Sequence, residues 1–513
     1  MAEQRHDLGS IMSAPVETVS PSATLADAAD SMTDHQFGAL VIGENGRVDG
    51  IVTERDLLRA SAAGASLQDA VADWMTSDPV TAKADTSFTA ALEQMQDGGF
   101  RHLPVVDGDG ALAGIVSLRD LIAVAHLEPV SHPGDLEAPK GLAGVIVSET
   151  EIGDVRGQEG FYHYREYSAT DLAEQCTIED VWHLMLRGEL PDDEQRAAFV
   201  EEVTPLREVP KRTAELLPAV AATADQPLDG LRTAVSLVGA ELGFEPSIDL
   251  TAEVLADQAL RITAVVPTLI MALYRLGRGD ERVAPDPELP YAANYLKMMT
   301  GDTPDPEHAR AVEQYLISTI DHGFNASTFT ARVITSTGAD LAAAVVGAIG
   351  ALSGPLHGGA PSRALDLLDE IQDPDRADEV VRHKVENGER IMGFGHRVYK
   401  TQDPRSKMLG QVAQRLGGDR AELAAQVEQT VVDVLADLKP GRELYANVEY
   451  YAGVVFEQIG LPPALFTPTF TASRTIGWCA HILEQAADNR LIRPTARYVG
   501  PPPPQPIPDH ARR

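Results

Sequence analysis

The chain has few cysteines, and it lacks long apolar runs. Its two cysteines, Cys176 and Cys479, are too few for a disulfide framework among 513 residues, so we expect a reducing compartment. The N-terminal residues MAEQRHDLGS lack the apolar core of a signal peptide. The most apolar stretch, Leu341–Leu352, is far shorter than the roughly 20 residues that span a bilayer. We therefore expect a soluble, cytoplasmic protein that does not bind a membrane.

Positive charge is also scarce. The chain carries 42 Lys and Arg residues, only eight of them Lys, against 77 Asp and Glu, for a formal net charge of −35. A surface this acidic repels phosphate backbones, so we do not expect nucleic acid as the main partner. Either a high-salt cytoplasm or a GC-rich genome accounts for this composition, and both alternatives stay open.

The length and composition predict several globular domains. A chain of 513 residues corresponds to two to four domains at roughly 100–200 residues each. Hydrophobic residues make up 44% and charged residues 23%, which is ordinary for proteins with sizeable cores. We therefore expect a multidomain protein.

The N-terminal part contains an internal repeat. The segment Ile11–Met32 reappears as Trp74–Met95, and Gly50–Leu58 reappears as Gly114–Ile122, at an offset of about 63 residues. Both copies have the same order of features, and repeats of this kind indicate one structural unit used twice.

Each copy predicts a short extended segment, a helix, two strands around a tight turn and a final helix. The turns are ENG at 44–46 and DGDG at 107–110, and Asn-Gly and Asp-Gly between apolar runs are strong hairpin signals. Thr53 and Ser117 are placed to cap the N-terminus of the final helix in each copy.

This repeat resembles a pair of CBS (cystathionine β-synthase-type) domains. The resemblance rests on the pattern G-h-h-[ST]-x-x-D, present as Gly50–Asp56 and Gly114–Asp120. It implies an α/β pair related by a pseudo-twofold axis over residues 1–127, with copies at about 8–62 and 71–127.

The same resemblance implies a site for an adenine nucleotide (AMP, ADP or ATP). In such domains the hydroxyl and carboxylate of the motif bind the ribose, which a helix N-terminus and a carboxylate suit chemically. An alternative reading is that these side chains only cap helices. The candidate ribose contacts are Thr53, Asp56, Ser117 and Asp120, with Arg101 and His102 as candidate phosphate partners.

A linker and a long helical region follow the repeat. Proline, glycine and charge accumulate over residues 128–139, which predicts a linker. Residues 140–500 are dominated by helical periods, for example over Asp171–Pro191, Ser327–Ser336 and Asp419–Leu438, with a strand-like run, GVIVSETEIGDV, near Gly144. This predicts one large mostly α-helical domain, followed by a Pro-rich tail at 501–513.

Three histidines of this region stand in unusual contexts. They are His322 in DHGFNASTFTAR, His357 in GALSGPLHGGAPS and His396 in MGFGHRVYKTQDPRSK. Each alone is better explained as a histidine of a surface loop. Arginines bind carboxylates bidentately, so a site that combines these histidines with two or three arginines and one carboxylate base suits a polycarboxylate substrate that undergoes proton abstraction next to a carbonyl.

Residues 140–500 resemble citrate synthase. The resemblance covers GLAGVIVSETEIGDV, YREY, DLAEQ, HGFNASTFTAR, GPLHGG, GFGHRVYKTQDPR and TASRTIGWCAHILEQ. It is nearest to the shorter bacterial and archaeal branch, and RLIRPTARYVGP is similar to actinobacterial members. It implies a homodimer in which each subunit has a large domain and a mobile small domain, here about 363–467, with the active site between them. Further assembly of dimers through the CBS pairs stays open.

The resemblance also implies the reaction and its catalytic residues. The family condenses acetyl-CoA with oxaloacetate and hydrolyses the thioester, with no metal or catalytic cofactor. His357 is implied to stabilise the enol or enolate, and His396 to polarise the ketone. The base position falls on Glu449 in NVEYYAG, where most relatives have NVDFYSG with an aspartate.

Substrate-binding residues follow from the same motifs. His322, Arg405 and Arg474 are implied to hold the carboxylates of oxaloacetate. Relatives also have an arginine that reaches across the dimer, where this chain has Thr495 with Arg493 beside it, and Arg493 is therefore a further candidate. The candidate contacts for the CoA phosphates are Arg397 and Lys400.

Two departures leave alternatives open. The extra methylene of Glu449 moves its carboxylate by about 1.5 Å, and a misplacement of that size can cost about 10²-fold in rate. The chain is thus a competent synthase, a slower or differently selective one, or a catalytically impaired protein that binds ligands for regulation. Propionyl-CoA differs from acetyl-CoA by one methylene, so a 2-methylcitrate synthase is the alternative of the same class.

Overall fold

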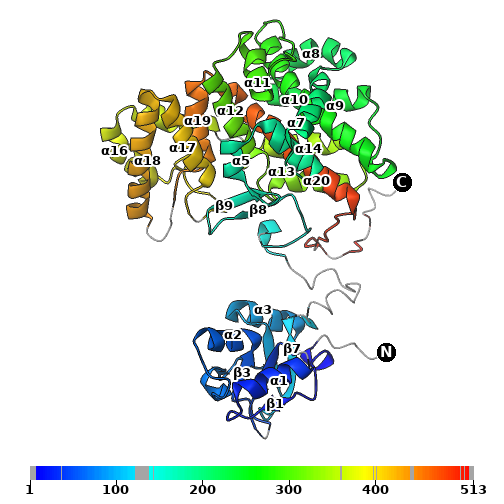
Figure 1. Ribbon diagram of the computed structural model, residues 1–513, viewed down its shortest axis with the longest axis vertical. Helices are drawn as coiled ribbons and strands as arrows, with labels where there is room; N and C mark the ends of the chain where they lie inside the picture. The colour runs from blue at the N-terminus through cyan, green and yellow to red at the C-terminus, as the bar shows by residue number, and fades with distance from the viewer. Residues whose placement is uncertain are drawn as a thin grey trace. The chain divides into compact units, whose positions relative to one another are not determined.

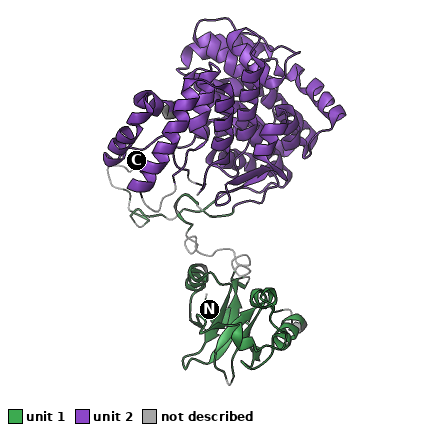
Figure 2. Ribbon diagram, turned by 60° about the vertical axis from the view of Figure 1, so that its left-hand side comes forward, with its two compact units in different colours: residues 1–146, 494–513 green, residues 147–493 purple. Residues whose placement is uncertain are grey.

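The computed structural model contains two compact units, residues 1–146 with 494–513 and residues 147–493 (Figures 1 and 2). It describes residues 7–35, 37–44, 46–118, 120–121, 138–142, 144–358, 361–396, 398–399, 401–439, 444–496, 498–501, 503–505 and 507. The predicted linker, 128–139, and tail, 501–513, lie largely outside the described residues. The predicted fold class, an α/β pair followed by a mostly helical domain, is confirmed.

The first unit repeats one order of elements. In both copies a short strand is followed by a helix, a β-hairpin and a second helix, as predicted. The elements of the first copy are β1 (Thr18–Val19), α1 (Leu25–His35), β2 (Ala39–Ile42), β3 (Gly50–Thr53) and α2 (Glu54–Ala62). Those of the second are β5 (Ala82–Lys83), α3 (Phe88–Gly98), β6 (His102–Val106) and β7 (Leu112–Ser117), after which helix begins at residue 118.

The two copies exchange their leading segments. The strand β4 (Thr76–Ser77), near the start of the second copy, pairs antiparallel with β3 of the first. Ser13, near the start of the first copy, bridges to Ile115 in β7 of the second. Each sheet therefore includes or contacts residues from the other copy, so the pair forms one interlocked unit with two small cores.

The second unit is mostly helical and begins with a small antiparallel sheet. The sheet contains β8 (Gly153–Arg156), β9 (Phe161–Tyr164) and β10 (Tyr167–Ser168) in the order β10-β9-β8. The helices that follow are α5 (Ala169–Gln175), α6 (Ile178–Arg187), α7 (Asp193–Val203), α8 (Lys211–Thr223), α9 (Pro227–Glu241), α10 (Ala252–Gly277), α11 (Tyr291–Thr300), α12 (Pro306–Thr319), α13 (Ala326–Ser336), α14 (Leu341–Leu352), α15 (Pro361–Ile371), α16 (Ala377–Glu386), α17 (Pro404–Leu416), α18 (Asp419–Leu438), α19 (Val448–Gln458) and α20 (Phe466–Ala487).

Two sequence expectations differ from the structure. The period over Asp171–Pro191 is divided between α5 and α6, because Thr177 and Asp180 form a capping box that starts a new helix. The strand-like run near Gly144 forms no strand before Gly153, and Ile146 within it is 87% exposed. Only its last three residues, 153–155, pair in the sheet, as the first part of β8, so the strand is much shorter than the run.

The long helix α10 forms part of the core of the second unit. Among the described residues it is the one helix that is long and apolar enough to cross a membrane, and 78% of its most apolar window is buried within the protein. It packs against α20, α9 and α8. Burial of this kind is typical of a core helix, and such helices pass the same length and composition test.

Helices α16 to α19 gather on one side of the second unit, drawn in yellow to orange in Figure 1. There α17 packs on α19 and α16 on α18, while α12 packs against α17. The ends of these helices, together with the start of α13 and the middle of α20, carry the side chains described next.

Candidate active site

The loops that carry His322 and His396 meet in the second unit. The centres of their imidazole rings are 5.5 Å apart, and the Tyr399 ring lies 5.5 Å from His322 and 4.8 Å from His396. The Tyr399 hydroxyl and His322 Nε2 are 3.0 Å apart and share a hydrogen bond. Segments that are 74 residues apart in numbering thus form one cluster.

The environment of His322 keeps its imidazole neutral. Burial, followed by the positive charge of Arg405, lowers the pKa of His322 well below its ordinary value. His396, Arg474 and His357 lower it further, which means that all of them lie within electrostatic range. At pH 7 this ring is a hydrogen-bonding group without charge.

The ring of His396 is oriented by backbone. Its Nδ1 accepts the N–H groups of Val398 at 3.0 Å and Tyr399 at 3.1 Å. Because a backbone N–H can only donate, Nδ1 carries a lone pair, and the proton of the neutral ring lies on Nε2. Nε2 lies 3.4 Å from a terminal nitrogen of Arg405, which also only donates, so this contact is not a hydrogen bond while Nε2 carries the proton. His396 therefore presents an N–H donor to the cluster.

Ser327, in the first turn of α13, holds the imidazole ring of His357. Its Nε2 lies 2.8 Å from Ser327 Oγ and accepts the Ser327 N–H at 3.3 Å. The proton therefore lies on Nδ1. Trp478 Nε1 donates to the same Ser327 hydroxyl, and Asn325 caps the helix through the N–H of Ser327. Burial, followed by the positive charge of Arg474, lowers the pKa of His357 to about 4, so it too is neutral at pH 7.

Arg405 is buried and paired within its own turn. It is 3% exposed, and its Nε and one terminal nitrogen donate to the two carboxylate oxygens of Asp403 at 3.1 and 2.8 Å. Asp403 also caps α17 and accepts the Val448 N–H at 3.2 Å, which ties α17 to α19. The rings of Tyr162 and Tyr399 flank the guanidinium at 5.9 and 5.7 Å. This arrangement fixes the plane of the guanidinium.

Arg474 lies in the middle of α20 and is 1% exposed. Its Nε donates to Thr319 O at 2.9 Å, and the Phe470 ring lies 4.6 Å from its guanidinium carbon. One terminal nitrogen, Nη1, is buried and has no hydrogen-bond partner among the described residues. Native proteins rarely leave a buried charged donor unpaired, so this atom is suited to receive a ligand oxygen.

Glu449 stands in the first turn of α19. Its N–H donates to the capping side chain of Asn447 at 3.0 Å, while no described residue donates a hydrogen bond to its carboxylate. Burial raises the pKa of Glu449 to about 7, although the nearby Arg405 lowers it in part. A carboxylate with a pKa near the working pH is suited to act as a general base.

The structure therefore brings together six of the predicted residues of this unit. They are His322, His357, His396, Arg405, Glu449 and Arg474. Arg493 is exposed after the end of α20 and makes no described hydrogen bond or ion pair with them. The candidate CoA contacts, Arg397 and Lys400, lie outside the described residues.

Sequence reasoning overlooked several side chains that hold this cluster. Tyr399 and Asp403 stand inside the motif GFGHRVYKTQDPR, and Asp before Pro-Arg is a helix-capping signal. Ser327 follows the capping residue Asn325, and Trp478 is distant in sequence. The capping signals were readable, but the contact of Ser327 with His357 was not, since 30 residues separate them.

In the first unit, the candidate ribose contacts form two equivalent pairs. Asp56 Oδ2 accepts the Thr53 N–H at 2.9 Å and its hydroxyl at 2.7 Å. Asp120 Oδ2 accepts from Ser117 in the same way, at 2.8 and 2.7 Å. These are capping contacts, so the predicted caps are confirmed, and one oxygen of each carboxylate is already used.

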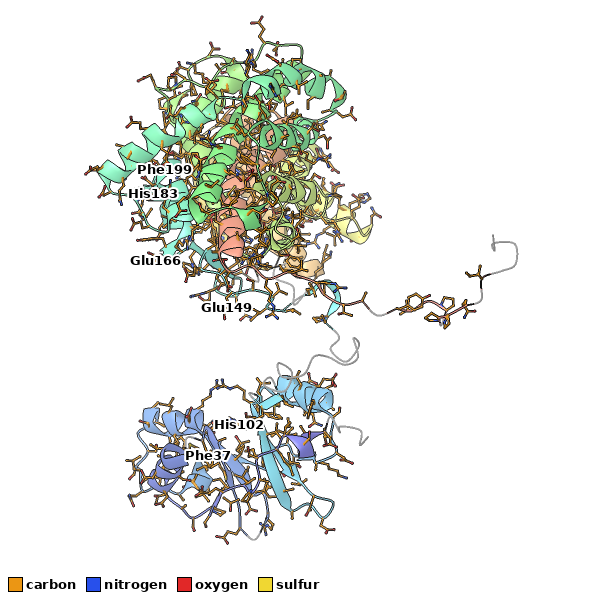
Figure 3. The ribbon with its side chains drawn as sticks, turned by 90° about the vertical axis from the view of Figure 1, so that its right-hand side faces the viewer. Phe37, His102, Glu149, Glu166, His183 and Phe199 are labelled. Carbon is orange, nitrogen blue, oxygen red and sulfur yellow. The ribbon has the colours of Figure 1, made fainter. Side chains whose placement is uncertain are left out.

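Arg101 and His102 lie at the start of β6, close to the first copy. A Cβ at Gly38, the residue after Phe37, would be 3.6 Å from His102 Nε2 (Figure 3). Burial, followed by the positive charge of Arg101, lowers the pKa of His102, while Asp120 and Glu54 oppose this. His102 is therefore mostly neutral at pH 7, and Arg101 is the cationic member of the pair.

Known protein families match the sequences of both units. The family profile described as "Citrate synthase, C-terminal domain" matches residues 141–495, and the CBS domain profile matches residues 8–63 and 71–126. Among solved structures, citrate synthase from Pyrobaculum aerophilum has a TM-score of 0.66 at 36% identity and covers 74% of this chain and 97% of its own. Citrate synthase from Thermoplasma acidophilum, solved with carboxymethyl coenzyme A and oxaloacetate, has a TM-score of 0.67 at 30% identity, with 73% and 100% covered.

Curated relatives have similar names. Citrate synthase from Haloferax volcanii is 40% identical over 370 residues, which cover 71% of this chain and 96% of the relative. The 2-methylcitrate synthase of Mycobacterium tuberculosis is 41% identical over 382 residues, which cover 74% and 95%. The chain therefore belongs to the citrate synthase family of acyltransferases, with a pair of CBS domains before the synthase domain.

Proposed function

We propose that the protein condenses acetyl-CoA with oxaloacetate and water to give citrate and CoA, with no metal or catalytic cofactor. The observation that carries this proposal is the carboxylate of Glu449. It is half-buried, lacks a described hydrogen-bond donor and has a pKa near 7, beside neutral histidines and two buried arginines. Carbanion chemistry next to a carbonyl needs such a base and uncharged donors for the developing oxyanion.

The first step is the transfer of a proton from the methyl carbon of acetyl-CoA to Glu449. Negative charge then develops on the thioester oxygen, which a donor must stabilise. We assign this role to the Nδ1–H of His357, since its Nε2 already accepts the Ser327 N–H. The low pKa of His357 supports donation from a neutral ring rather than from an imidazolium.

The second step forms the new carbon–carbon bond. The nucleophilic carbon attacks the ketone of oxaloacetate, and the ketone oxygen becomes an alkoxide that needs a donor. The Nε2–H of His396 supplies it, because two backbone N–H groups occupy Nδ1. Water then hydrolyses the thioester and releases CoA as a free thiol.

Two arginines and His322 bind the carboxylates of oxaloacetate. Arg405 is fixed by Asp403, and Arg474 Nη1 has no described partner. Both guanidinium groups are removed from water, which strengthens a pair with a carboxylate. Arg493 is assigned a secondary role at this site from the subunit across a dimer, because it is exposed on its own subunit.

The first test is thiol release from acetyl-CoA, with and without oxaloacetate, at low and high salt. We expect release that depends on oxaloacetate. Release that is absent under every condition from a folded protein would instead support the catalytically impaired, ligand-binding alternative. The species assayed is identified by light scattering, so that activity is assigned to a defined oligomer.

Propionyl-CoA is the second candidate acyl donor, since a 2-methylcitrate synthase is as similar to this chain as the citrate synthases are. One methylene discriminates by only about 1–3 kcal/mol, or about 10- to 200-fold. The ratio of thiol release from propionyl-CoA and acetyl-CoA therefore identifies the preferred substrate in the same assay.

We further propose that the synthase domain forms a homodimer through the outer face of α14. This helix is apolar throughout, and Ala343, Val346, Gly347 and Gly350 are only half-buried on one side of it. A Cβ at Gly350 would meet nothing within 4 Å. A helix face without charged residues suits the core of an interface with a second copy, where charged residues are depleted.

The small domain is assigned to about 363–467, where α15 to α19 gather.

The CBS pair is proposed to bind an adenine nucleotide and to regulate the synthase. The second carboxylate oxygen of Asp120, to which no described residue donates, and the charge of Arg101 support this proposal. The second oxygen of Asp56 forms an ion pair with Arg59 at 3.1 Å, which a ribose would have to displace. Regulation requires that nucleotide and substrate affinities prove coupled. Cytoplasmic localisation stays a prediction.

Removing both carboxylates tests this nucleotide site. Asp56→Ala with Asp120→Ala is expected to abolish any shift of Tm caused by AMP, ADP or ATP. It also removes two capping contacts, at about 1 kcal/mol each, so the baseline Tm of the first unit falls. Asp27→Ala, which removes a similar capping contact to Thr24, is the matched control and should keep the nucleotide shift. An unchanged shift in the double variant would show that the ribose contacts are wrong.

A further inference from the structure

The β8–β9 hairpin lies against the loop that carries His322. A Cβ on Gly323, the next residue, would lie 3.3 Å from Val155 Cγ2 in β8. From β9, the Tyr162 ring lies 5.8 Å from the His322 ring, and its hydroxyl donates to Ser318 O at the end of α12 at 3.0 Å. One side of the hairpin is therefore fixed against the His322 loop.

The turn of the same hairpin, residues 157–160, meets the loop that carries His396. A Cβ on Gly157 would overlap the carbonyl group of Val398, at 2.7 Å from its carbon, and would lie 3.0 Å from Val398 Cγ1. Real Cβ atoms do not approach backbone this closely. Glycine at position 157 is therefore required for the turn to reach this loop.

A second glycine makes an equivalent contact. A Cβ on Gly160 would lie 2.7 Å from Thr401 Oγ1 and 3.3 Å from Gln402 O. The φ angle of Gly160 is +63°, which also favours glycine. The hydroxyl of Thr401 is buried and has no described hydrogen-bond partner, so it is held there by packing against the turn.

Both contacts bear on the orientation of His396. The N–H groups of Val398 and Tyr399 hold His396 Nδ1, and the Tyr399 hydroxyl bonds to His322. A shift of Val398 away from the turn therefore moves one donor of His396 and loosens the link between the two histidines. The hairpin thus contacts the loops on both sides of the cluster.

We propose that the β8–β9 hairpin sets the separation of His322 and His396, with Gly157 and Gly160 as positioning residues that touch no substrate. This rests on the proposed function, in which both histidines contact oxaloacetate. Displacement of the His396 loop by a Cβ weakens oxaloacetate binding and ketone polarisation, while the acetyl-CoA contacts through His357 and Glu449 are kept.

The first test compares Gly157→Ala with Gly277→Ala. Gly277 ends α10, and a Cβ there meets nothing within 4 Å. For Gly157→Ala we expect the KM for oxaloacetate to rise about tenfold and kcat/KM to fall about 10²-fold, with the KM for acetyl-CoA within about twofold of wild type. Gly277→Ala should keep wild-type values.

The second test separates steric contact from backbone strain. Gly160→Ala introduces both, whereas Gly188→Ala, at φ +96° with nothing within 4 Å, introduces strain alone. We expect the KM for oxaloacetate to rise only in Gly160→Ala. Adding Thr401→Ala to Gly160→Ala removes the clashing hydroxyl and should restore the KM by several-fold. This rescue keeps the proposal testable if Gly157→Ala does not fold.

The outcomes distinguish the two proposals. Suppose that the wild type releases thiol with oxaloacetate, so that the proposed function stands. The positioning role is then wrong if Gly157→Ala keeps the wild-type KM for oxaloacetate. It is also wrong if Gly157→Ala raises the KM for oxaloacetate and the KM for acetyl-CoA equally and lowers the Tm. If the wild type releases no thiol, the proposed function is wrong. A rise in the KM for oxaloacetate alone, with rescue of Gly160→Ala by Thr401→Ala, supports the proposal that the β8–β9 hairpin sets the separation of His322 and His396.

Discussion

Glu449→Gln is expected to lower kcat by about 10²–10⁴-fold, the contribution of a positioned general base. The variant keeps the shape and the capping of the Glu449 N–H by Asn447, so it removes only the ability to accept a proton. Thiol release from acetyl-CoA under saturating oxaloacetate measures the effect. A loss below tenfold would contradict the assignment of Glu449 as the base.

The pH dependence supplies an independent check. The base must be ionised, and its pKa lies near 7, so kcat/KM is expected to fall by about tenfold for each pH unit below 7. Glu449→Gln should lack this slope. A pH profile that is the same in both proteins would place the titrating group elsewhere.

The stability of the folded protein should fall as the pH rises, whereas its activity should increase. Because burial raises the pKa of Glu449 in the folded state, that state binds more protons than the unfolded chain between about pH 4.3 and 7. The contribution of this carboxyl to stability is therefore lost as the pH rises through that range. Glu449→Gln, which does not ionise, is expected to have a higher Tm than wild type above pH 7, so lost activity does not reflect unfolding.

Glu449→Asp is the matched comparison for side-chain length. Removing one methylene retracts the carboxylate by about 1.5 Å from a site in which Asn447 already fixes the backbone. We expect a fall in kcat if the chain has adapted to glutamate. A large gain would instead show that Glu449 is a displaced base and would favour the slow or impaired alternatives.

Arg474→Met is expected to raise the KM for oxaloacetate by about 30-fold or more, because a buried pair of charges is worth about 2–5 kcal/mol when one partner is truncated. The structure supplies the reason, since Arg474 Nη1 is buried without a described partner while Nε is held by Thr319 O. Steady-state kinetics with varied oxaloacetate measure the change.

The folded state should tolerate this substitution. The variant loses one hydrogen bond to Thr319 O but also removes an unpaired buried donor, so the two effects oppose each other. Arg261→Met is the control and should leave the KM unchanged, because this arginine on α10 pairs with no described side chain other than Asp257. An unaltered KM in Arg474→Met would remove Arg474 from the proposed oxaloacetate site.

Much of the architecture was predictable from local patterns. The repeat around Gly50 and Gly114, the turns at 44–46 and 107–110, and the helix Asp419–Leu438 were all read from periodicity and turn residues, which depend on neighbours along the chain. The division of Asp171–Pro191 into α5 and α6 was missed, although Thr177 and Asp180 offered a capping signal.

The candidate site was also predictable only in part. The sequence by itself determined which residues to consider, because His322, His357 and His396 stand in motifs of fixed spacing and the resemblance assigned their roles. It also predicted, through the resemblance, that Glu449 stands at the base position where most relatives have aspartate.

Only the tertiary structure decided the state of these groups. The pKa of Glu449 near 7, the neutral ring of His357 and the unpaired nitrogen of Arg474 all result from burial by segments that are far apart in sequence. The approach of Gly157 to Val398 spans more than 200 residues of chain. Desolvation and steric contact depend on which atoms meet in space, and local sequence patterns do not carry that information.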